Sequence, residues 1–362
     1  MREDEPLESW LFRVENNKQY PPTPRDLELN RTALSQFNDA LAAQPEGRLN
    51  YSGLPIHTLG RYSSATLIGD QIDHAQQLFL QVWRRGGTRA NYAMDVLLDS
   101  IALAMDVGSV PFWKQLLDLS RPRDQSTTRR RTYALAALAL LAIVVGDEQA
   151  HQSLAEALTH PHEQVRALAA PYIAETYRRS VHPLPPAIQA ALTDIARNDR
   201  AFVARFQARK ALRQLGAPVP IDSPNLIYLL KVQLRSDQAT RTIAIPADHT
   251  LADLHYAIQH AFDWDADHLY SFYLTNNRAE KHYAIHCPEL DENWDFTVWS
   301  ITGVDMRAVP TSDESNTPVT DLDLALEDEG LDEGGEIYTT NTRIGALGLV
   351  NKHSFMYFFD YG

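Results

Sequence analysis

The sequence predicts an all-α helical repeat domain followed by a smaller α+β domain. Three observations lead to this fold class. Helical periodicity with almost no strand signal extends over residues 24–216. An arginine-centred pattern recurs within that region. Beyond residue 226 the apolar spacing changes, and it predicts the order strand, strand, helix, strand.

Length and charge support two units of different character. A chain of 362 residues is long enough for two domains. Residues 1–220 carry a net charge of +2, whereas residues 221–362 hold 8 Lys+Arg and 24 Asp+Glu, a net charge of −16. Because the acidic part would repel phosphate backbones, any contact with nucleic acid has to come from the N-terminal part.

Cysteine usage and hydropathy favour a cytoplasmic protein without a membrane segment. Cys287 is the single cysteine, which excludes an intramolecular disulfide and is typical of a reducing compartment. The N-terminal stretch MREDEPLESW is acidic and polar, unlike a signal peptide, and we interpret residues 1–23 as a tail. The longest apolar run, residues 133–146, is shorter than the ~20 residues that a bilayer helix needs.

The N-terminal domain, residues 24–216, is expected to consist of helices that end at glycine and proline residues. The predicted helices are 24–43, 65–84, 89–107, 110–119, 128–145, 148–159, 163–179, 186–197 and 201–215. A linker rich in proline follows at residues 217–225.

An internal repeat lies in the second half of this domain. An arginine begins a helix and is followed by a small residue and then by a larger apolar one on the same face. The pattern occurs as Arg131-Ala134-Leu138, Arg166-Ala169-Ile173 and Arg205-Ala208-Leu212. It resembles HEAT repeats, which implies paired antiparallel helices stacked into a solenoid with an extended surface for partners.

A basic cluster, RPRDQSTTRRR, stands out at residues 121–131. This stretch contains one acidic residue and five arginines, which are Arg121, Arg123, Arg129, Arg130 and Arg131. One interpretation is a patch for phosphate or an acidic partner. The alternative is a solvated loop that leads into a helix, and no aromatic residues are interleaved for base stacking.

The C-terminal domain, residues 226–362, begins with two alternating stretches, 227–235 and 240–246, which predict a β-hairpin. Thr250 is a suitable N-cap for a helix over residues 251–262. Leu251, Leu254, Ile258 and Phe262 share one face of that helix, and the alternating Tyr270 and Phe272 predict a third strand. This order is that of β-grasp, ubiquitin-like domains, with the helix packed across the sheet.

The helix and its flanks carry a further resemblance. The pattern L-x-x-L-H-x-x-I-Q-x-x-F-x-W, then H-L, and the terminal FMYFFDYG resemble the plasmid pRiA open-reading-frame-three-like family. The matching residues are Leu251, Leu254, His255, Ile258, Gln259, Phe262, Trp264, His268, Leu269, Asp360 and Gly362. Family members associated with insertion elements imply a connection with mobile elements.

This chain departs from the family pattern in two places. Many members have a Trp-Arg pair in the second strand, where Ala239, Thr240 and Arg241 stand here. Members also continue beyond the aromatic strand, whereas this sequence ends at Gly362, so we expect the domain to be truncated.

Two segments raise the question of a metal. Residues 308–342 form an acidic insertion with ten Asp+Glu and no Lys or Arg. Asp321 and Asp323 are spaced like the first ligands of a calcium loop, but Ala325 and Leu326 occupy later positions that need a ligand and a glycine. His282, His286 and Cys287 are close in sequence, yet on a strand Cys287 points away from the histidines. We therefore assign no metal ligands, and we interpret the insertion as a solvated loop that could also dock on a basic patch.

The sequence contains none of the usual catalytic motifs, and Asp263, Asp265 and Asp267 are expected in a loop. We assign no catalytic residues and no cofactor. The favoured function is a non-catalytic binding or scaffold protein that engages a protein partner through the solenoid surface and the α+β domain. One alternative is a nucleic-acid-associated accessory protein of mobile elements, and another is an enzyme with an unrecognised site.

Overall fold

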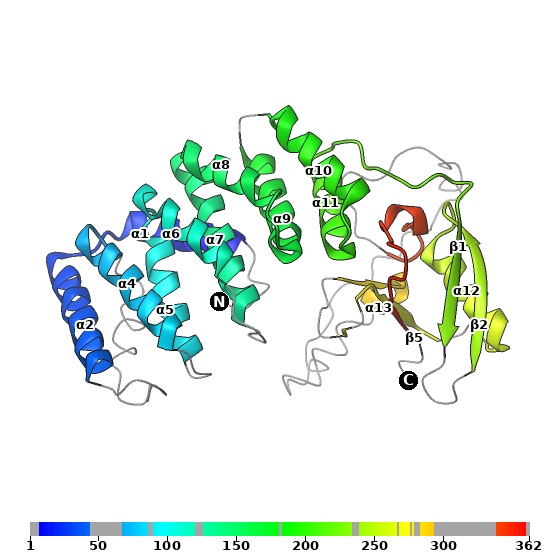
Figure 1. Cartoon of the computed structure of the whole chain (residues 1–362), viewed down its shortest axis with the longest axis horizontal. Coiled ribbons are helices and arrows are strands. Elements are labelled where there is room, and N and C mark those ends of the chain that lie inside the picture. Colours follow the sequence, from blue (N-terminus) through cyan, green and yellow to red (C-terminus); the bar gives the residue numbers. More distant parts are fainter. Residues whose placement is uncertain are drawn as a thin grey trace, which may run out of the picture. The chain divides into compact units, whose positions relative to one another are not determined.

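The computed structural model describes residues 7–43, 67–85, 90–119, 126–180, 183–233, 239–265, 268–275, 277–278, 283–292 and 338–359. The described part is mostly helical, with twelve α-helices and a small region of sheet near the C-terminus. The chain divides into two compact units, Met1–Leu192 and Thr193–Gly362 (Figure 1). The boundary falls inside α10, Pro186–Asn198.

The first unit is built from helices that pack mainly on their neighbours in the chain. α4 packs on α2 and α5, and α7 packs on α6, α8 and α9. These helices are α1 Leu7–Gln19, α2 Pro24–Ala42, α4 Asp70–Arg85, α5 Ala90–Leu103, α6 Val110–Asp118, α7 Ser126–Leu140, α8 Glu148–Ala157 and α9 Glu163–Arg179. The periodicity identified each helix from α2 to α9 that the structure describes, and α9 has the predicted bounds.

The first helix, α1, corrects the interpretation of residues 1–23 as a tail. Leu7, Trp10 and Val14 are buried, and the helix packs on α5 and α7. The indole of Trp10 meets the ring of Tyr133 edge-on, at 5.7 Å between centroids. The three buried residues gave too weak a periodic signal, because the rest of the helix is mostly polar and Phe12 is exposed, although their spacing of three and four is helical.

The end of α7 also differs from the prediction of one α-helix over 128–145. The α-helix ends at Leu140 and continues as a π-helical turn over Leu141–Val145. Gly146 then adopts a left-handed conformation, with φ 73°, which glycine accepts without strain. A change in hydrogen-bond register of this kind leaves no mark in apolar spacing.

The second unit contains α11, Phe202–Gln214, and the predicted α+β region. β1, Ile227–Gln233, pairs antiparallel with β2, Thr240–Pro246, as a two-stranded sheet. β3, Tyr270–Tyr273, lies between β4, Ala284–His286, and β5, Met356–Phe359, with both pairings antiparallel. α13, Pro288–Glu292, follows β4. The strands of the described residues thus form two sheets.

α12, Leu251–Phe262, has the predicted bounds and the predicted cap. The Thr250 side chain accepts a hydrogen bond from the Asp253 amide, and the Asp253 carboxylate accepts one from the Thr250 amide. This capping box satisfies two donors at the start of the helix. Asp263 ends α12 in a left-handed conformation, with φ 57°.

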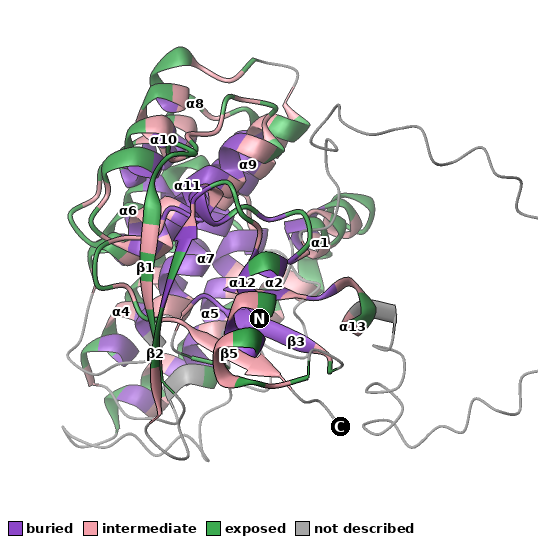
Figure 2. Ribbon diagram, turned by 90° about the vertical axis from the view of Figure 1, so that its right-hand side faces the viewer, coloured by how far each residue is buried: buried purple, intermediate pink, exposed green. Residues whose placement is uncertain are grey.

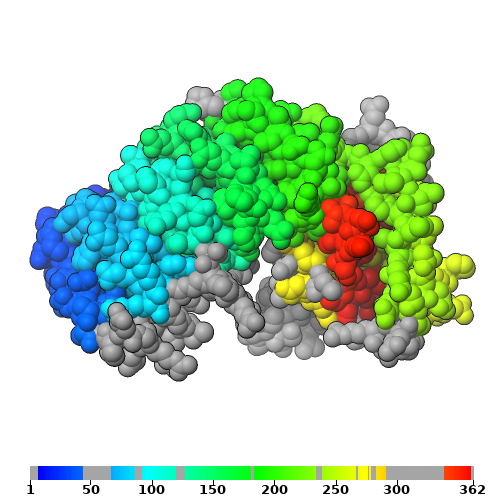
Figure 3. All heavy atoms as spheres, viewed as in Figure 1, coloured from blue at the N-terminus to red at the C-terminus, as the bar shows by residue number. Residues whose placement is uncertain are grey.

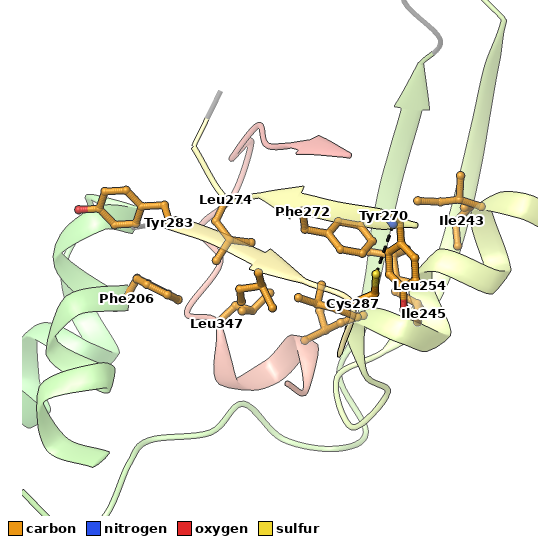
Figure 4. Close-up of a cluster of buried hydrophobic side chains, with 14 of the residues drawn as sticks. Phe206, Ile243, Ile245, Leu254, Tyr270, Phe272, Leu274, Tyr283, Cys287 and Leu347 are labelled. Atoms are coloured by element: carbon orange, nitrogen blue, oxygen red, sulfur yellow. Dashed lines mark hydrogen bonds between the residues drawn. The ribbon is translucent and has the colours of Figure 1, made fainter. Parts of the chain in front are cut away.

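One apolar core joins α11, α12 and the strands of the second unit. The predicted core residues Leu251, Leu254, Ile258, Tyr270 and Phe272 are all buried, and Phe262 packs at the edge. Phe202 and Phe206 of α11 belong to the same core. Figure 4 shows Phe206 projecting from α11 on one side of the cluster, with Leu347 and Leu274 near it. α11, the last of the helices predicted for the repeat domain, is therefore part of the fold of this unit.

No helix among the described residues is long and apolar enough to cross a membrane. The apolar stretch in α7 is instead a buried helix of the first unit, since Tyr133 to Leu141 are all buried there (Figure 2).

Candidate functional site

The family-signature residues on α12 meet β5 through a shared hydroxyl group. The Gln259 amide donates to the Tyr357 hydroxyl oxygen at 2.6 Å, and that hydroxyl lies 2.7 Å from Nδ1 of His255. A hydroxyl group can form both hydrogen bonds at once, so it links the two side chains. His255 and Gln259 are four residues apart, so they occupy adjacent turns on one face of α12.

His255 is held as a neutral ring. Burial lowers its pKa to about 4, so the imidazole is uncharged at neutral pH. Its ring lies on that of Tyr270, with centroids 3.7 Å apart and an interplanar angle of 9°. Burial also raises the pKa of Tyr270 to about 12, and its hydroxyl is 3.0 Å from Oγ1 of Thr339. Only 2% of His255 is exposed, so it is a packing residue with little access for a substrate.

The other described signature residues gather around Phe359. The Trp264 ring stacks between neighbours, 5.1 Å from Phe262 and 4.6 Å from Phe359. His268 meets Phe359 edge-on at 6.2 Å. Leu254 and Ile258 lie in the core, whereas Asp360 and Gly362 fall outside the described residues. The structure thus brings the signature together around Tyr357 and Phe359, which share one face of β5.

A serine–histidine pair lies across β3 and β4, and the sequence did not point to it. Ser271 and His286 are register partners, and Oγ of Ser271 is 2.6 Å from Nδ1 of His286. This is the spacing of a nucleophile and its base. Ser271 is fully buried, however, so its hydroxyl has no path to a substrate. Only the strand register, which is a long-range contact, creates the pair.

Cys287 belongs to the core. Its sulfur accepts a long hydrogen bond of 3.5 Å from the Tyr270 amide (Figure 4), and burial raises the pKa of its thiol. A buried neutral thiol is a poor nucleophile and a poor metal ligand. His282 of the candidate zinc trio lies outside the described residues.

Metal ligands do not come together in the described part of the chain, where no group of three His, Cys, Asp or Glu is placed to hold an ion. The calcium-like residues Asp321 and Asp323 and the acidic insertion up to residue 337 lie outside the described residues. Of the three aspartates around Trp264, Asp263 ends α12 and Asp265 is exposed.

Two arginines of the basic cluster are buried inside the first unit. Arg130 is 3% exposed, and its guanidinium lies 3.5 Å from the ring centre of Trp83. Arg131 is 2% exposed and donates to the Leu117 carbonyl at 3.1 Å and to Oε1 of Gln164 at 2.8 Å. A phosphate would have to displace these contacts. Arg121 and Arg123 lie outside the described residues.

Arg129 forms an ion pair with Asp95 of α5 at 2.8 Å. Burial nevertheless raises the pKa of Asp95 to about 6, because desolvation of the carboxylate outweighs the attraction of Arg129. Burial also raises the pKa of Asp99, one turn further on, whose nearest arginine is Arg13 at 3.7 Å. The basic cluster therefore joins α7 to α5 by polar contacts that apolar periodicity could not reveal.

The outer face of the β1–β2 hairpin is an exposed apolar surface that the sequence analysis did not single out. Tyr228, Leu230 and Val232 face the core, whereas Ile227 and Leu229 point outward and are 58% and 73% exposed. Their register partners are Pro246 and Ala244 on β2. The preceding Leu226 is 45% exposed. We call Leu226, Ile227, Leu229 and Ala244 the hairpin patch. Exposed and half-buried residues alternate along β1 (Figure 2).

The comparisons with known proteins concern the C-terminal part of the chain. Residues 226–362 match the family model described as Plasmid pRiA4b ORF-3-like protein. This match confirms the resemblance carried by α12 and the terminal strand. Neither the curated proteins nor the solved structures include a match to this chain.

Proposed function

Since residues 226–362 match the Plasmid pRiA4b ORF-3-like family model, we propose that this chain is a non-catalytic binding protein. The hairpin patch binds an apolar segment of a protein partner. The observation that carries the proposal is the exposure of Ile227 and Leu229 on a strand whose other face is already packed on the core.

A strand that has large apolar residues on both faces is unusual at a solvated surface. Strands at the edge of a sheet normally carry polar or charged outward residues, which prevent unwanted association. Within the described residues β1 pairs with β2 alone, so its other edge also offers backbone donors and acceptors. An extended partner segment could add to this edge and cover Leu229, which is a common mode of peptide recognition.

The charge of this part of the chain defines the partner further. Residues 221–362 carry a net charge of −16, so these segments of two copies of the chain repel one another. A partner with basic residues around its apolar segment would be attracted instead. Lys231, the next outward residue on β1, is the only cation on the described part of the outer β1 face. We therefore expect a basic protein, different from this chain.

The helical unit serves in this proposal as a HEAT-like scaffold. Three arginines at the repeated position support it, because each donates to a carbonyl near the end of the preceding helix or in the turn that follows it. Arg131 donates to Leu117, Arg166 donates to His160 and Pro161, and Arg205 donates to Asp199. The recurrence of this kind of contact in α6–α7, α8–α9 and α10–α11 supports a structural repeat.

A β-grasp arrangement is the corresponding proposal for the second unit. The order β1, β2, α12, β3 supports it, and α12 packs on β2. Figure 3 shows the C-terminal segment beside the hairpin on one face of the molecule. In a β-grasp domain the two sheets of the described residues would pair with each other to form one continuous sheet.

Protein binding is favoured over the two alternatives by the state of the polar residues. Arg130 and Arg131 use their guanidinium groups for internal contacts, which argues against a phosphate patch. Ser271, His286 and Cys287 carry the chemistry of an enzyme, but Ser271 and Cys287 are buried without a described channel.

Affinity capture with the full tagged chain tests the proposal. Leu229→Asp should reduce recovery of the bound protein at least about tenfold, because it places a charge in an apolar contact. Val145→Asp, which changes a residue of the first unit that is 49% exposed, is the matched control and should leave recovery unchanged. Equal recovery with both variants would overturn the hairpin patch, and recovery that depends on nucleic acid would favour the mobile-element alternative.

A further inference from the structure

Helix α1 contacts three helices of the first unit that follow it at a distance in the sequence. It packs on α5 and α7 (dark blue in Figure 1). Its Glu8 carboxylate pairs with Arg179 of α9 at 2.5 Å and lies 3.9 Å from Arg178. Since α7 packs on both α5 and α9, these three helices form a continuous surface, which we call the α5–α7–α9 surface. α1 covers part of it.

The contacts of α1 define what this surface holds. Three apolar residues of α1 are buried on one face of the helix, namely Leu7, Trp10 and Val14. Trp10 meets Tyr133 of α7, and Arg13 approaches Asp99 of α5 at 3.7 Å. The surface thus takes an amphipathic helix that carries a carboxylate in its first turn, an aromatic residue after it and then a cation.

The attachment of α1 is weaker than that of its neighbours. α1 buries three of its 13 residues, whereas α4 buries seven of 16. The Glu8 side chain is 61% exposed, so water and salt screen its ion pairs. Nδ2 of Asn17, Oδ1 of Asp99 and the hydroxyl of Tyr133 are buried without a hydrogen-bond partner of good geometry among the described residues. Such groups oppose the docking of α1.

The link to α2 allows α1 to leave without disturbing the next helix. Residues 20–23 form this link and are largely exposed. Pro21 and Pro22 prevent a continuous helix from α1 into α2. α2 begins with its own capping box, in which the side chains of Thr23 and Asp26 each accept a hydrogen bond from the backbone of the other residue. The start of α2 is therefore complete without α1.

We propose that α1 is a displaceable cover and that the α5–α7–α9 surface binds an amphipathic helix of a protein partner in its place. The partner helix resembles α1, with apolar residues at the positions of Leu7, Trp10 and Val14 and a carboxylate that reaches Arg179. The short link gives α1 a local concentration on the order of millimolar, which excludes helices that fit less well. All residues of this site belong to the first unit, so the proposal does not depend on the hairpin patch.

Hydrogen exchange of the full-length protein, followed by mass spectrometry, tests whether α1 detaches. We expect the amides of α1 to exchange at least about a hundredfold faster than those of α7, because α1 opens while the rest of the unit stays folded. Trp10→Ala should speed exchange in α1 further and leave α2 unchanged. Equal protection of α1 and α7 would make α1 an integral part of the fold and would overturn the proposal.

A fluorescent peptide of residues 7–19 tests whether the surface accepts a helix from another molecule. It should bind the full-length Trp10→Ala chain at least about tenfold more tightly than wild type, because the weakened cover competes less. Phe12→Ala, at a 66% exposed position of the same helix, is the matched control and should behave as wild type. Val14→Ala replaces Trp10→Ala if circular dichroism shows that the latter loses helix. No gain in affinity overturns the proposal.

A charge exchange locates the bound peptide. A peptide with Glu8→Arg should bind the Trp10→Ala chain about threefold or more weakly, and Arg179→Glu in the chain should restore the affinity. Absence of this rescue would place the peptide elsewhere and overturn the assigned surface. Light scattering separates a foreign partner from a second copy. A wild-type dimer that is lost in Trp10→Ala would put α1 of a second copy on the surface and contradict a foreign partner.

Discussion

The imidazole of His255 and the phenol ring of Tyr270 lie face to face, 3.7 Å apart and 9° from parallel. This contact joins α12 to β3 at the centre of the second unit. Together with the hydrogen bond from Tyr357, it explains why a histidine occupies a core position of α12. The ring is flat enough to stack, and its Nδ1 forms a hydrogen bond with the hydroxyl group, which a leucine could not do.

The stability of the second unit should therefore depend on the charge of His255. Its pKa of about 4 in the folded state lies below the ordinary value of 6.5. Its contribution is complete above pH 6.5 and is lost as the pH falls toward 4, because the unfolded chain binds the proton more readily. We expect a loss of about 2 kcal/mol of unfolding free energy between pH 7 and pH 4.5 from this residue.

Urea unfolding of wild type and His255→Gln at several pH values measures this effect. The comparison between the two proteins is essential, because Asp95 of the first unit, whose pKa is raised to about 6, contributes with the opposite sign. A pH dependence that is unchanged in His255→Gln would show that the histidine is not buried as a neutral ring.

Tyr357→Phe should destabilise the second unit by about 1–3 kcal/mol, because it leaves Nδ1 of His255 and the Gln259 amide without their shared partner. Chemical unfolding followed by circular dichroism measures the change. Tyr256→Phe is the matched control, since Tyr256 is 59% exposed and its loss of a hydroxyl should cost less than about 0.5 kcal/mol. Equal effects of the two substitutions would refute the role of the Tyr357 hydroxyl.

Arg131→Met should destabilise the first unit by about 2–3 kcal/mol, because it removes the donors to the Leu117 carbonyl and Gln164 from a buried site. Arg31→Met, at an exposed position paired only with Glu28 at 3.0 Å, should change stability by less than about 0.5 kcal/mol. Thermal unfolding of the two variants gives the comparison. An Arg131→Met protein as stable as wild type would favour the view that this arginine is kept for a ligand.

Gly345→Ala tests the contact between the C-terminal segment and the loop before α12. A Cβ atom at residue 345 would lie 2.9 Å from the Ala247 carbonyl oxygen and 3.0 Å from the Ala247 side chain. The backbone also bonds here, since the Gly345 amide donates to that carbonyl at 2.7 Å. We expect a loss of about 1–3 kcal/mol in the unfolding free energy, measured with urea. No loss would mean that the segment is not packed as described.

Local signals predicted most of the secondary structure. The apolar spacing and the capping residue Thr250 gave the bounds of α12, and the breakers Pro161 and Pro183 flank α9. The sequence did not predict helix α1, because it has few buried residues and they are separated by polar ones. The signature on α12 was identified correctly, but its role as a packing cluster depends on Tyr357, about a hundred residues away.

The candidate sites were harder to predict, because they depend on contacts between distant residues. In the sequence, residues 129–131 form a charge cluster. In the structure each arginine has a partner within the fold: Arg129 pairs with Asp95, Arg130 stacks on Trp83, and Arg131 donates to the Leu117 carbonyl. The sequence also contains a signal for the hairpin patch. The first strand has apolar residues at outward as well as inward positions, and the outward ones are Ile227 and Leu229, preceded by Leu226.

Site-specific photo-crosslinking at Leu229 tests whether the hairpin patch binds a protein partner. A photoreactive residue is placed at position 229 of the full chain, or at Val145 as the control, and crosslinked products are identified after nuclease treatment. We expect a defined protein to be crosslinked from position 229, to be absent from the control, and to be lost when Ile227→Asp is added. Absence of a protein product at 229, or the same products from both positions, would contradict binding through the hairpin patch.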